Sequence, residues 1–359
     1  MNKVVARTSA SRVVSSARCL QALADGSNQQ GAVMVLVALS LAVLIPLLAL
    51  VLDVGQALVA KQGLHNLVDA AALAGARQLG RIYEATPPTK AGRTLPPSGR
   101  GHVNGVVADV SGKNQLPNHP AAVRSTLGVW NAPARTLIGG RVLPDGVHVS
   151  AQAQVPTVVA SAVGVKTLAV SADATAALTG LSQVPAGSLA LPFGIARGWF
   201  SGKGKGWASR SFVLTKNGTS PVCAAWSTFT QTPATQKQLH TIVKRIRTGT
   251  YRSPVANSGQ TRFQFLGTKP GAAFQELQSL YQSRRDSKTG DWLVVVPVYD
   301  RGTCAAVTGP TMIVGFATVR LNQKGKTQLS ATVVTNQIQA GRGGGTDYGT
   351  KGSIPGLVK

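Results

Sequence analysis

The sequence predicts an α+β protein in which a single N-terminal transmembrane helix continues as an amphipathic helix and is followed by a β-rich region. Three observations support this fold class. Residues 31–52 form a run without a charged side chain. Residues 54–71 then place apolar side chains at helical spacing. Beyond residue 146, apolar and polar residues alternate, and the 40 glycines and 19 prolines of the chain are typical of strands joined by turns.

The uncharged run is long enough to span a membrane. At about 1.5 Å per residue, residues 31–52 make a helix of about 33 Å, against a hydrocarbon core of about 30 Å. A buried helix of a soluble protein normally carries a polar stripe, which this run lacks. A cleaved secretory signal has a shorter apolar region and small residues at its cleavage site, and residues 53–56 offer no such site. We therefore predict a retained anchor.

The residues that flank the run predict its orientation. Residues 1–30 contain four basic residues and one acid, Asp25. The basic residues are Lys3, Arg7, Arg12 and Arg18. Because short cytoplasmic segments carry an excess of Lys and Arg, this tail is expected in the cytoplasm, and everything after Leu52 is expected to be translocated.

The three cysteines fit this topology. With Cys19 in the reducing cytoplasm, Cys223 and Cys304 are left together in an oxidising compartment. Two such cysteines most economically form one disulfide. The chain has no C-x-x-C pair, so neither a zinc ribbon nor a thioredoxin-type redox site is predicted.

The chain is strongly basic, with a formal net charge of +25. Between Asp173 and Glu276 there is no acid, whereas twelve Lys and Arg residues occur from Arg197 to Lys269. Such a surface attracts polyanions, for example acidic lipids or anionic envelope polymers, although solubility alone explains the charge equally well. Binding of nucleic acid is not predicted, because the chain lacks a helix-turn-helix, zinc-finger or RNP-like motif.

No catalytic, cofactor-binding or metal-binding residues are predicted. The glycines and lysines of residues 202–206 lack the spacing of a phosphate-binding loop. The five histidines show no metal-ligand spacing, and the local carboxylates Asp286, Asp291 and Asp300 are expected to balance neighbouring arginines. The chain is thus predicted not to be an enzyme, with an exported hydrolase of unfamiliar site as a rival hypothesis.

The distribution of charged, apolar, glycine and proline residues divides the chain into six segments. These are a basic tail (1–30), the transmembrane helix (31–52), the amphipathic helix (53–82), a loop-rich linker (83–145), a β-rich basic domain (146–340) and a flexible tail (341–359). Strands are predicted at 146–155, 168–178, 211–214, 222–229, 292–299 and 311–320. Helices are predicted at 233–247 and 271–284, and a short helix or turn at 157–164.

One segment resembles a known family. Asp53-Val54-Gly55 follows the apolar run, and an alanine-rich block from Asp69 to Ala76 follows after a spacer. This ordering resembles the N-terminal segment of TadE/TadG-like proteins of tight-adherence (Flp) pilus assembly. Relatives cut by prepilin peptidase usually have a glutamate where this chain has Leu36, and the metal site of larger relatives has no counterpart here.

The resemblance implies an envelope scaffold of a Tad-type pilus or secretion machine. It would be a single-pass protein of the bacterial inner membrane, with its bulk in the periplasm and other Tad pilus-assembly proteins as partners. The alternative is a module that is tethered to the inner membrane and binds anionic cell-wall or outer-membrane polymers through residues 197–269.

Three residues at the start of the amphipathic helix are predicted to form a docking face for another assembly helix. Gly55 and Gly63 lie eight residues apart, about 12 Å along one face, and a glycine allows a neighbouring backbone to approach closely. Asp53 stands at the expected boundary between lipid and water. The alternative is that the glycines mark a hinge and Asp53 only ends the span.

Overall fold

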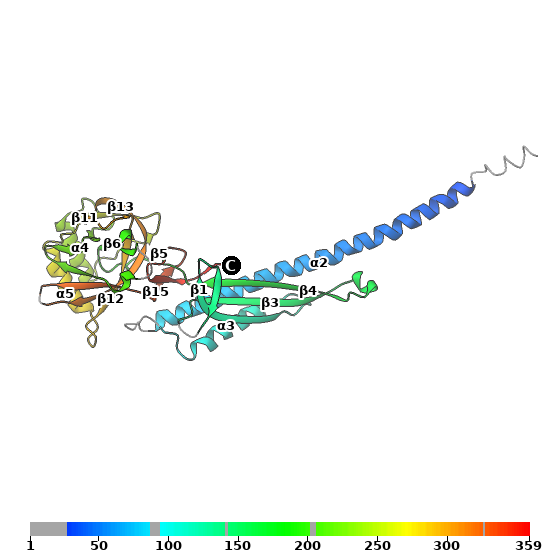
Figure 1. The fold of residues 1–359 in the computed structure, drawn as a ribbon, viewed down its shortest axis with the longest axis horizontal. Coiled ribbons are helices and arrows are strands. Elements are labelled where there is room, and N and C mark those ends of the chain that lie inside the picture. The colour runs from blue at the N-terminus through cyan, green and yellow to red at the C-terminus, as the bar shows by residue number, and fades with distance from the viewer. Residues whose placement is uncertain (1–26, 87–93, 141–142, 202–205, 326) are drawn as a thin grey trace, which may run out of the picture. The chain divides into compact units, whose positions relative to one another are not determined.

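The computed structural model describes residues 27–86, 94–140, 143–201, 206–325 and 327–359 (Figure 1). Most of the predicted basic tail, including Cys19, lies outside the described residues. The chain forms two compact units. The first contains residues up to 60 together with 154–170, and the second contains 61–153 and 171–359.

The first unit contains the apolar part of a long helix, α2 (Ser27–Ala85), drawn in blue in Figure 1. The large apolar side chains of residues 31–52 are between 48% (Val37) and 77% (Met34) exposed. Among the described residues, Gly31–Ala85 is one helix that is long and apolar enough to cross a membrane. Pro46 lies inside the helix, and the hydroxyl of Ser40 donates a hydrogen bond to the carbonyl of Val37 at 2.8 Å. Ser40 and Pro46 are therefore both accommodated within the helical backbone.

The first unit also contains the tip of a β-hairpin. Its strands β3 (Gly146–Pro156) and β4 (Thr167–Ala177) are neighbours in one sheet. A single 3₁₀ turn, η1 (Ala160–Val163), lies between them, where the sequence predicts a short helix or turn.

In the second unit, the remainder of α2 is amphipathic. Eight of its apolar side chains are fully buried: Leu64, Leu67, Val68, Ala71, Ala72, Ala76, Leu79 and Tyr83. Lys61, Gln62 and Asn66 are exposed. Close approach is made possible by Gly75, where an added Cβ would lie 2.7 Å from Val107 and 3.2 Å from Val147.

A five-stranded sheet in the order β17-β4-β3-β1-β2 packs near this helix. Its other strands are β1 (Ala122–Asn131), β2 (Thr136–Gly139) and β17 (Gly356–Leu357). β1 pairs antiparallel with β3, with Ala122 opposite Gln152 and Gly128 opposite Gly146. The alternation predicted for residues 146–155 is present, since Val147, Val149, Ala151, Ala153 and Val155 are buried.

The interval 83–145, predicted to be a loop-rich linker, contains α3 (Gly99–Lys113) as well as β1 and β2. The prediction of loops is wrong for these elements. In α3 the helix is hard to predict because its four glycines lower its intrinsic helix propensity. Packing provides the compensation. Val103 and Val107 are buried, and both lie against the position of Gly75.

The rest of the second unit is built on an eight-stranded sheet in the order β11-β9-β6-β12-β13-β14-β7-β8. The strands are β6 (Phe193–Ala196), β7 (Ser211–Thr215), β8 (Gly218–Ser220), β9 (Ala224–Ser227), β11 (Arg262–Gly267), β12 (Trp292–Tyr299), β13 (Thr308–Gln323) and β14 (Leu329–Val334). Because β11 also pairs with β13, the strands from β11 to β13 close into a ring. The core contains Phe193, Trp226 and Phe316, each at most 1% exposed.

Four helical elements accompany this sheet. They are η2 (Arg197–Phe200), η3 (Gly206–Ser209), α4 (Gln236–Arg247) and α5 (Ala273–Arg284). The two α-helices correspond to those predicted at 233–247 and 271–284. The predicted α+β class, with a candidate transmembrane helix before a β-rich region, is confirmed.

A four-stranded sheet in the order β10-β5-β15-β16 contains two of the last three strands of the chain, and the last strand, β17, belongs to the five-stranded sheet. The strands of the four-stranded sheet are β5 (Gln183–Val184), β10 (Ala256–Asn257), β15 (Gln337–Arg342) and β16 (Thr350–Ile354). The interval 341–359, predicted to be a flexible tail, is thus ordered, and Thr350 and Ser353 are fully buried. Its glycines allow close backbone packing: an added Cβ at Gly352 would lie 2.5 Å from the amide nitrogen of Gly343.

Candidate membrane-boundary site

Asp53 is the first residue after the uncharged run, and the structure buries it to 2% exposure. Its carboxylate accepts three backbone N–H groups from the tip of the β3–β4 hairpin. Oδ1 accepts from Val158 at 2.7 Å, and Oδ2 accepts from Val159 at 3.1 Å and Ala160 at 2.9 Å. A carboxylate that receives several N–H groups is strongly held, because each is a charge-assisted hydrogen bond. Asp53 therefore fastens the hairpin tip to the end of the apolar run.

The hairpin tip has its own internal hydrogen bonds. The N–H of Thr157 donates to the carbonyl of Lys166 at 3.1 Å, and the N–H of Val165 donates to the carbonyl of Ala160 at 2.9 Å. The hydroxyl of Thr157 donates to the carbonyl of Val165. Gly164 has a φ of +92°, a left-handed conformation that favours glycine. The tip is thus a defined turn that presents consecutive N–H groups to Asp53.

The structure gives the three predicted docking residues different surroundings. Asp53 is occupied by the hairpin tip. At Gly63, an added Cβ would lie 2.5 Å from the side chain of Leu116, so this glycine allows a contact within the second unit. At Gly55 nothing lies within 4 Å of an added Cβ. Of the three, only Gly55 offers open space for another helix.

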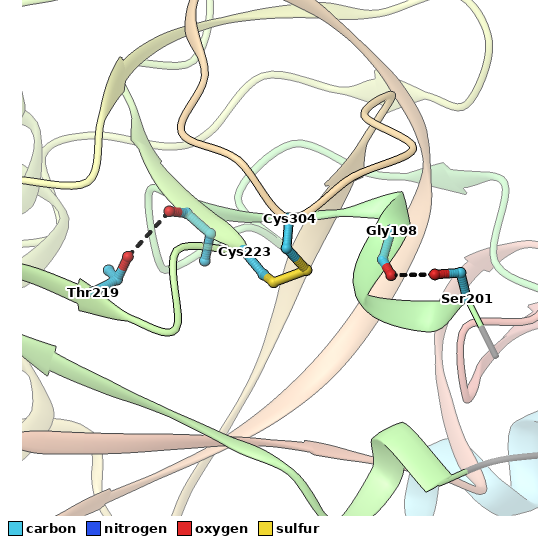
Figure 2. The surroundings of a disulfide bond; sticks show 6 residues. Gly198, Ser201, Thr219, Cys223 and Cys304 are labelled. Carbon is cyan, nitrogen blue, oxygen red and sulfur yellow. Dashed lines mark hydrogen bonds between the residues drawn. A yellow bond between two sulfur atoms is a disulfide. The ribbon is translucent and has the colours of Figure 1, made fainter.

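The predicted cysteine pair lies in the second unit. Cys223 and Cys304 form a disulfide with their Cα atoms 4.2 Å apart (Figure 2). Cys223 directly precedes β9, and Cys304 lies in the connection between β12 and β13. The carbonyl of Cys223 accepts the N–H of Ala196 at 2.8 Å. This hydrogen bond joins the disulfide to the last residue of β6.

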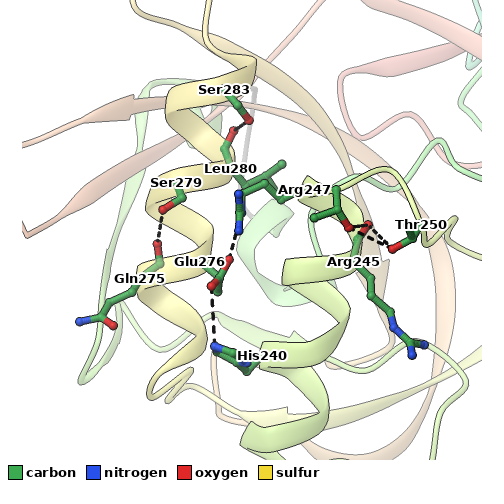
Figure 3. A network of polar contacts seen from close by, with 10 residues as sticks. His240, Arg245, Arg247, Thr250, Gln275, Glu276, Ser279, Leu280 and Ser283 are labelled. Atoms are coloured by element: carbon green, nitrogen blue, oxygen red, sulfur yellow. Dashed lines mark hydrogen bonds and ion pairs between the residues drawn. The ribbon is translucent and has the colours of Figure 1, made fainter.

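Helix α4 carries part of the basic surface predicted from the sequence. Thr235 caps its start by accepting the N–H of Gln238 at 3.2 Å. Its buried side chains are Leu239, Ile242, Val243 and Ile246. Its exposed cations are Lys237, Lys244, Arg245 and Arg247. Figure 3 shows that Glu276 of α5 lies between His240 and Arg247, with Arg247 Nε at 3.0 Å and His240 Nε2 at 3.9 Å. Glu276 therefore connects α5 to α4, while Lys237, Lys244 and Arg245 are exposed.

Within the described parts of the chain, no group of three His, Cys, Asp or Glu residues is placed to hold a metal ion. Two of the local acids singled out from the sequence have different partners. Asp286 accepts N–H groups from Lys288 and Thr289 in a turn, and Asp300 pairs with Arg197 at 3.2 Å. Hydrogen bonds from those two amides hold the pKa of Asp286 below its ordinary value.

Sequence reasoning identified Asp53 but missed its partners. Val158, Val159 and Ala160 act through backbone N–H groups, which every residue except proline has, and they lie more than 100 positions away. One signal was available. The turn between two well-predicted strands is apolar, from Val158 to Val165, where turns are usually built of polar residues.

We expect Asp53→Ala to release the hairpin tip. The three amides of Val158, Val159 and Ala160 should exchange with solvent at least about tenfold faster, because they lose hydrogen bonds to a charged acceptor. Hydrogen exchange of the full chain in detergent micelles measures this. Asp109→Ala, at an exposed residue of α3, is the matched control. Unchanged exchange at the three amides would show that Asp53 does not hold the tip.

Residues 31–78 match a protein-family model described as "Putative Flp pilus-assembly TadE/G-like". The matched range includes the uncharged run, Asp53 and the alanine-rich block of α2, so the resemblance drawn from the sequence is confirmed for this segment. No curated protein and no solved structure matches the chain. Residues 31–78 of this chain are thus similar to TadE/G-like pilus-assembly proteins.

Proposed function

We propose that this chain is a membrane-anchored scaffold protein of Tad-type (Flp) pilus assembly. The match of residues 31–78 to the TadE/G-like family model is the observation that carries the proposal. The family is one of pilus-assembly components and not of enzymes, which supports a structural role. The exposed apolar surface of residues 31–52 supports anchoring, since a surface of this kind is stable in lipid and not in water.

In this proposal the anchor crosses the bacterial inner membrane once, with the N-terminus in the cytoplasm. The excess of Lys and Arg before residue 31 supports this direction. The bulk of the chain would then lie in the periplasm. The pairing of Cys223 with Cys304 supports that location, because disulfides persist in oxidising compartments.

Other Tad pilus-assembly proteins are the proposed partners, and Gly55 is the proposed contact. It lies two residues after Asp53 on α2, and its missing side chain leaves open space that a neighbouring helix could occupy. Asp53 and Gly63 already contact residues of this chain, so the docking hypothesis narrows to Gly55.

Gly55→Leu in the native host tests the scaffold and its contact together. Leucine favours helix over glycine by about 1 kcal/mol, so α2 should form at least as well. Piliation should nevertheless be lost if a partner helix packs on this position. Gly105→Leu is the matched control, because Gly105 also lies in a helix with nothing within 4 Å of an added Cβ.

Two further measurements make the result interpretable. Reporter fusions that are active only in the periplasm should be active after Arg81 and inactive after Asp25, and the reverse pattern would refute the proposed topology. Normal piliation by Gly55→Leu would refute the contact. Normal piliation after deletion of the whole gene would refute the scaffold role itself.

A second candidate function is a tether that binds anionic cell-wall or outer-membrane polymers. The observation in its favour is the basic surface of residues 197–269. Ten cations among its described residues are exposed: Arg197, Arg210, Lys216, Lys237, Lys244, Arg245, Arg247, Arg252, Arg262 and Lys269. A surface that carries many cations attracts polyanions over distances of about 10 Å at moderate salt.

A further inference from the structure

The tip of the β3–β4 hairpin, residues 157–166, combines an apolar surface with a fixed position beside the end of α2's apolar run. Val158 is 65% exposed and Val165 is 44% exposed, and Ala162 is exposed as well. Lys166 is the one charged residue in this interval. An exposed apolar turn is unfavourable in water, which suggests that another medium covers it.

The hydrogen bonds to Asp53 fix the level of this tip along α2. Asp53 directly follows Leu52, the last residue of the uncharged run, and one residue is about 1.5 Å of helix. Ala49 lies one turn earlier on the same helical face and is also buried, at 8% exposure. It is the one buried residue of the interval 31–52. The tip therefore lies level with the last turn of the run.

The backbone of the tip is suited to a medium of low polarity. Seven of its N–H groups donate to acceptors within the chain. These are the N–H groups of Thr157, Val158, Val159, Ala160, Ala162, Gly164 and Val165. Because an unpaired N–H group is costly to remove from water, a turn in which seven of the ten N–H groups are paired can enter the edge of a bilayer at lower cost than a turn with open donors.

We infer that the hairpin tip is a second membrane contact, in which Val158 and Val165 enter the surface layer of the bilayer that α2 crosses. This inference rests on the proposed anchoring of α2. The partner is the lipid bilayer and not another protein, because the tip is held level with the hydrophobic run and continues its apolar surface. Lys166 is placed to meet lipid phosphate at the same level.

The contact has a structural consequence for α2. A lone helix can tilt and rotate in a bilayer, and its orientation is set by packing and by anchors at the interface. Asp53 joins the tip to the helix, so insertion of the tip restricts both motions. The first periplasmic turn of α2, including Gly55, would then face a defined direction in the membrane plane.

Nitroxide labels on the full chain test the inference. Val158→Cys and Val165→Cys are made singly in a Cys19→Ser background, with the Cys223–Cys304 disulfide intact, and the protein is reconstituted in bilayers of phosphatidylcholine and phosphatidylglycerol. Oxygen partitions into lipid, and a nickel chelate stays in water. The ratio of oxygen to nickel accessibility should be several-fold higher at both positions than at Ser171→Cys, an exposed control residue on β4.

A fourth label at Val43, inside the uncharged run, separates the possible failures. If Val43 reports lipid while positions 158 and 165 match Ser171, the tip faces water or a partner and the inference is overturned while anchoring stands. If Val43 itself reports water, both the anchor and the tip contact are overturned. Because positions 158 and 165 are independent exposed sites, loss of one variant through misfolding leaves the other as a test.

Discussion

Asp145→Ala is expected to lower the stability of the second unit by about 3 kcal/mol. Asp145 is 3% exposed and joins three segments of the fold. Its Oδ1 accepts the N–H of Trp130 at 2.6 Å, its Oδ2 accepts the ammonium group of Lys351, and its carbonyl accepts the N–H of Leu178 at 2.7 Å. Removing one partner of a buried ion pair costs about 3–5 kcal/mol, because the remaining charge is left uncompensated.

The lower end of that range applies because the side chain of Lys351 is 22% exposed and can reach some water. For a unit of this size, about 3 kcal/mol corresponds to a fall of roughly 6–12 °C in the midpoint of thermal unfolding. The midpoint is measured on the full chain in detergent micelles by circular dichroism. Asp109→Ala removes an exposed pair with Lys113, at 2.8 Å, and should shift the midpoint little.

A double variant separates the ion pair from the other roles of Asp145. When Lys351→Met is added to Asp145→Ala, the unpaired ammonium group is removed, so part of the lost stability should return. Equal shifts for Asp145→Ala and the Asp109→Ala control would contradict the assignment. No recovery in the double variant would place the effect on the hydrogen bond to Trp130 instead.

The parts of the fold that the sequence predicted are those with a local signal. The uncharged run, the helical spacing of Val54 to Ala71 and the alternation from Val147 to Val155 are each visible within a short window. Strand pairing beyond that window, such as the closure of the ring by β11 and β13, carries no local signal. It follows from packing between residues that are far apart in the chain.

Glycine explains two of the failed predictions. In the interval 341–359 the glycines indicated flexibility, but Gly352 and Gly343 allow backbone segments to pack closely. In α3 the glycines indicated a loop, but Gly75 on the partner helix makes room for Val103 and Val107. The same residue type is typical of mobile segments and of tight contacts, and the difference lies in the neighbouring backbone.

At the candidate site, too, one part could be predicted from the sequence and another could not. The position of Asp53 is predictable because a carboxylate is costly inside a bilayer and tolerable at its edge. Its partners are backbone groups on a turn more than 100 residues away, so no pattern of side chains identifies them. A buried carboxylate needs a partner, and that rule predicts that one exists without saying where it lies.

Loss of the disulfide is expected to lower stability by about 4 kcal/mol. The two cysteines are 81 positions apart, and a cross-link of that span removes a large part of the conformational entropy of the unfolded chain. The bond connects the segment before β9 with the loop from β12 to β13, so it also links parts of the ring that are separated by β6. The double variant Cys223→Ser/Cys304→Ser avoids a reactive single thiol.

Thermal unfolding of the full chain, with and without reductant, measures the effect. The double variant should unfold at the same lowered temperature in both conditions, whereas the native chain should fall to that temperature only when it is reduced. Cys19→Ser is the matched control, and its midpoint should equal that of the native chain. Mass mapping without reduction should find residues 223 and 304 in one linked peptide pair. Two free thiols in protein purified from the envelope would refute the pairing, and with it the support that the disulfide gives to an oxidising location.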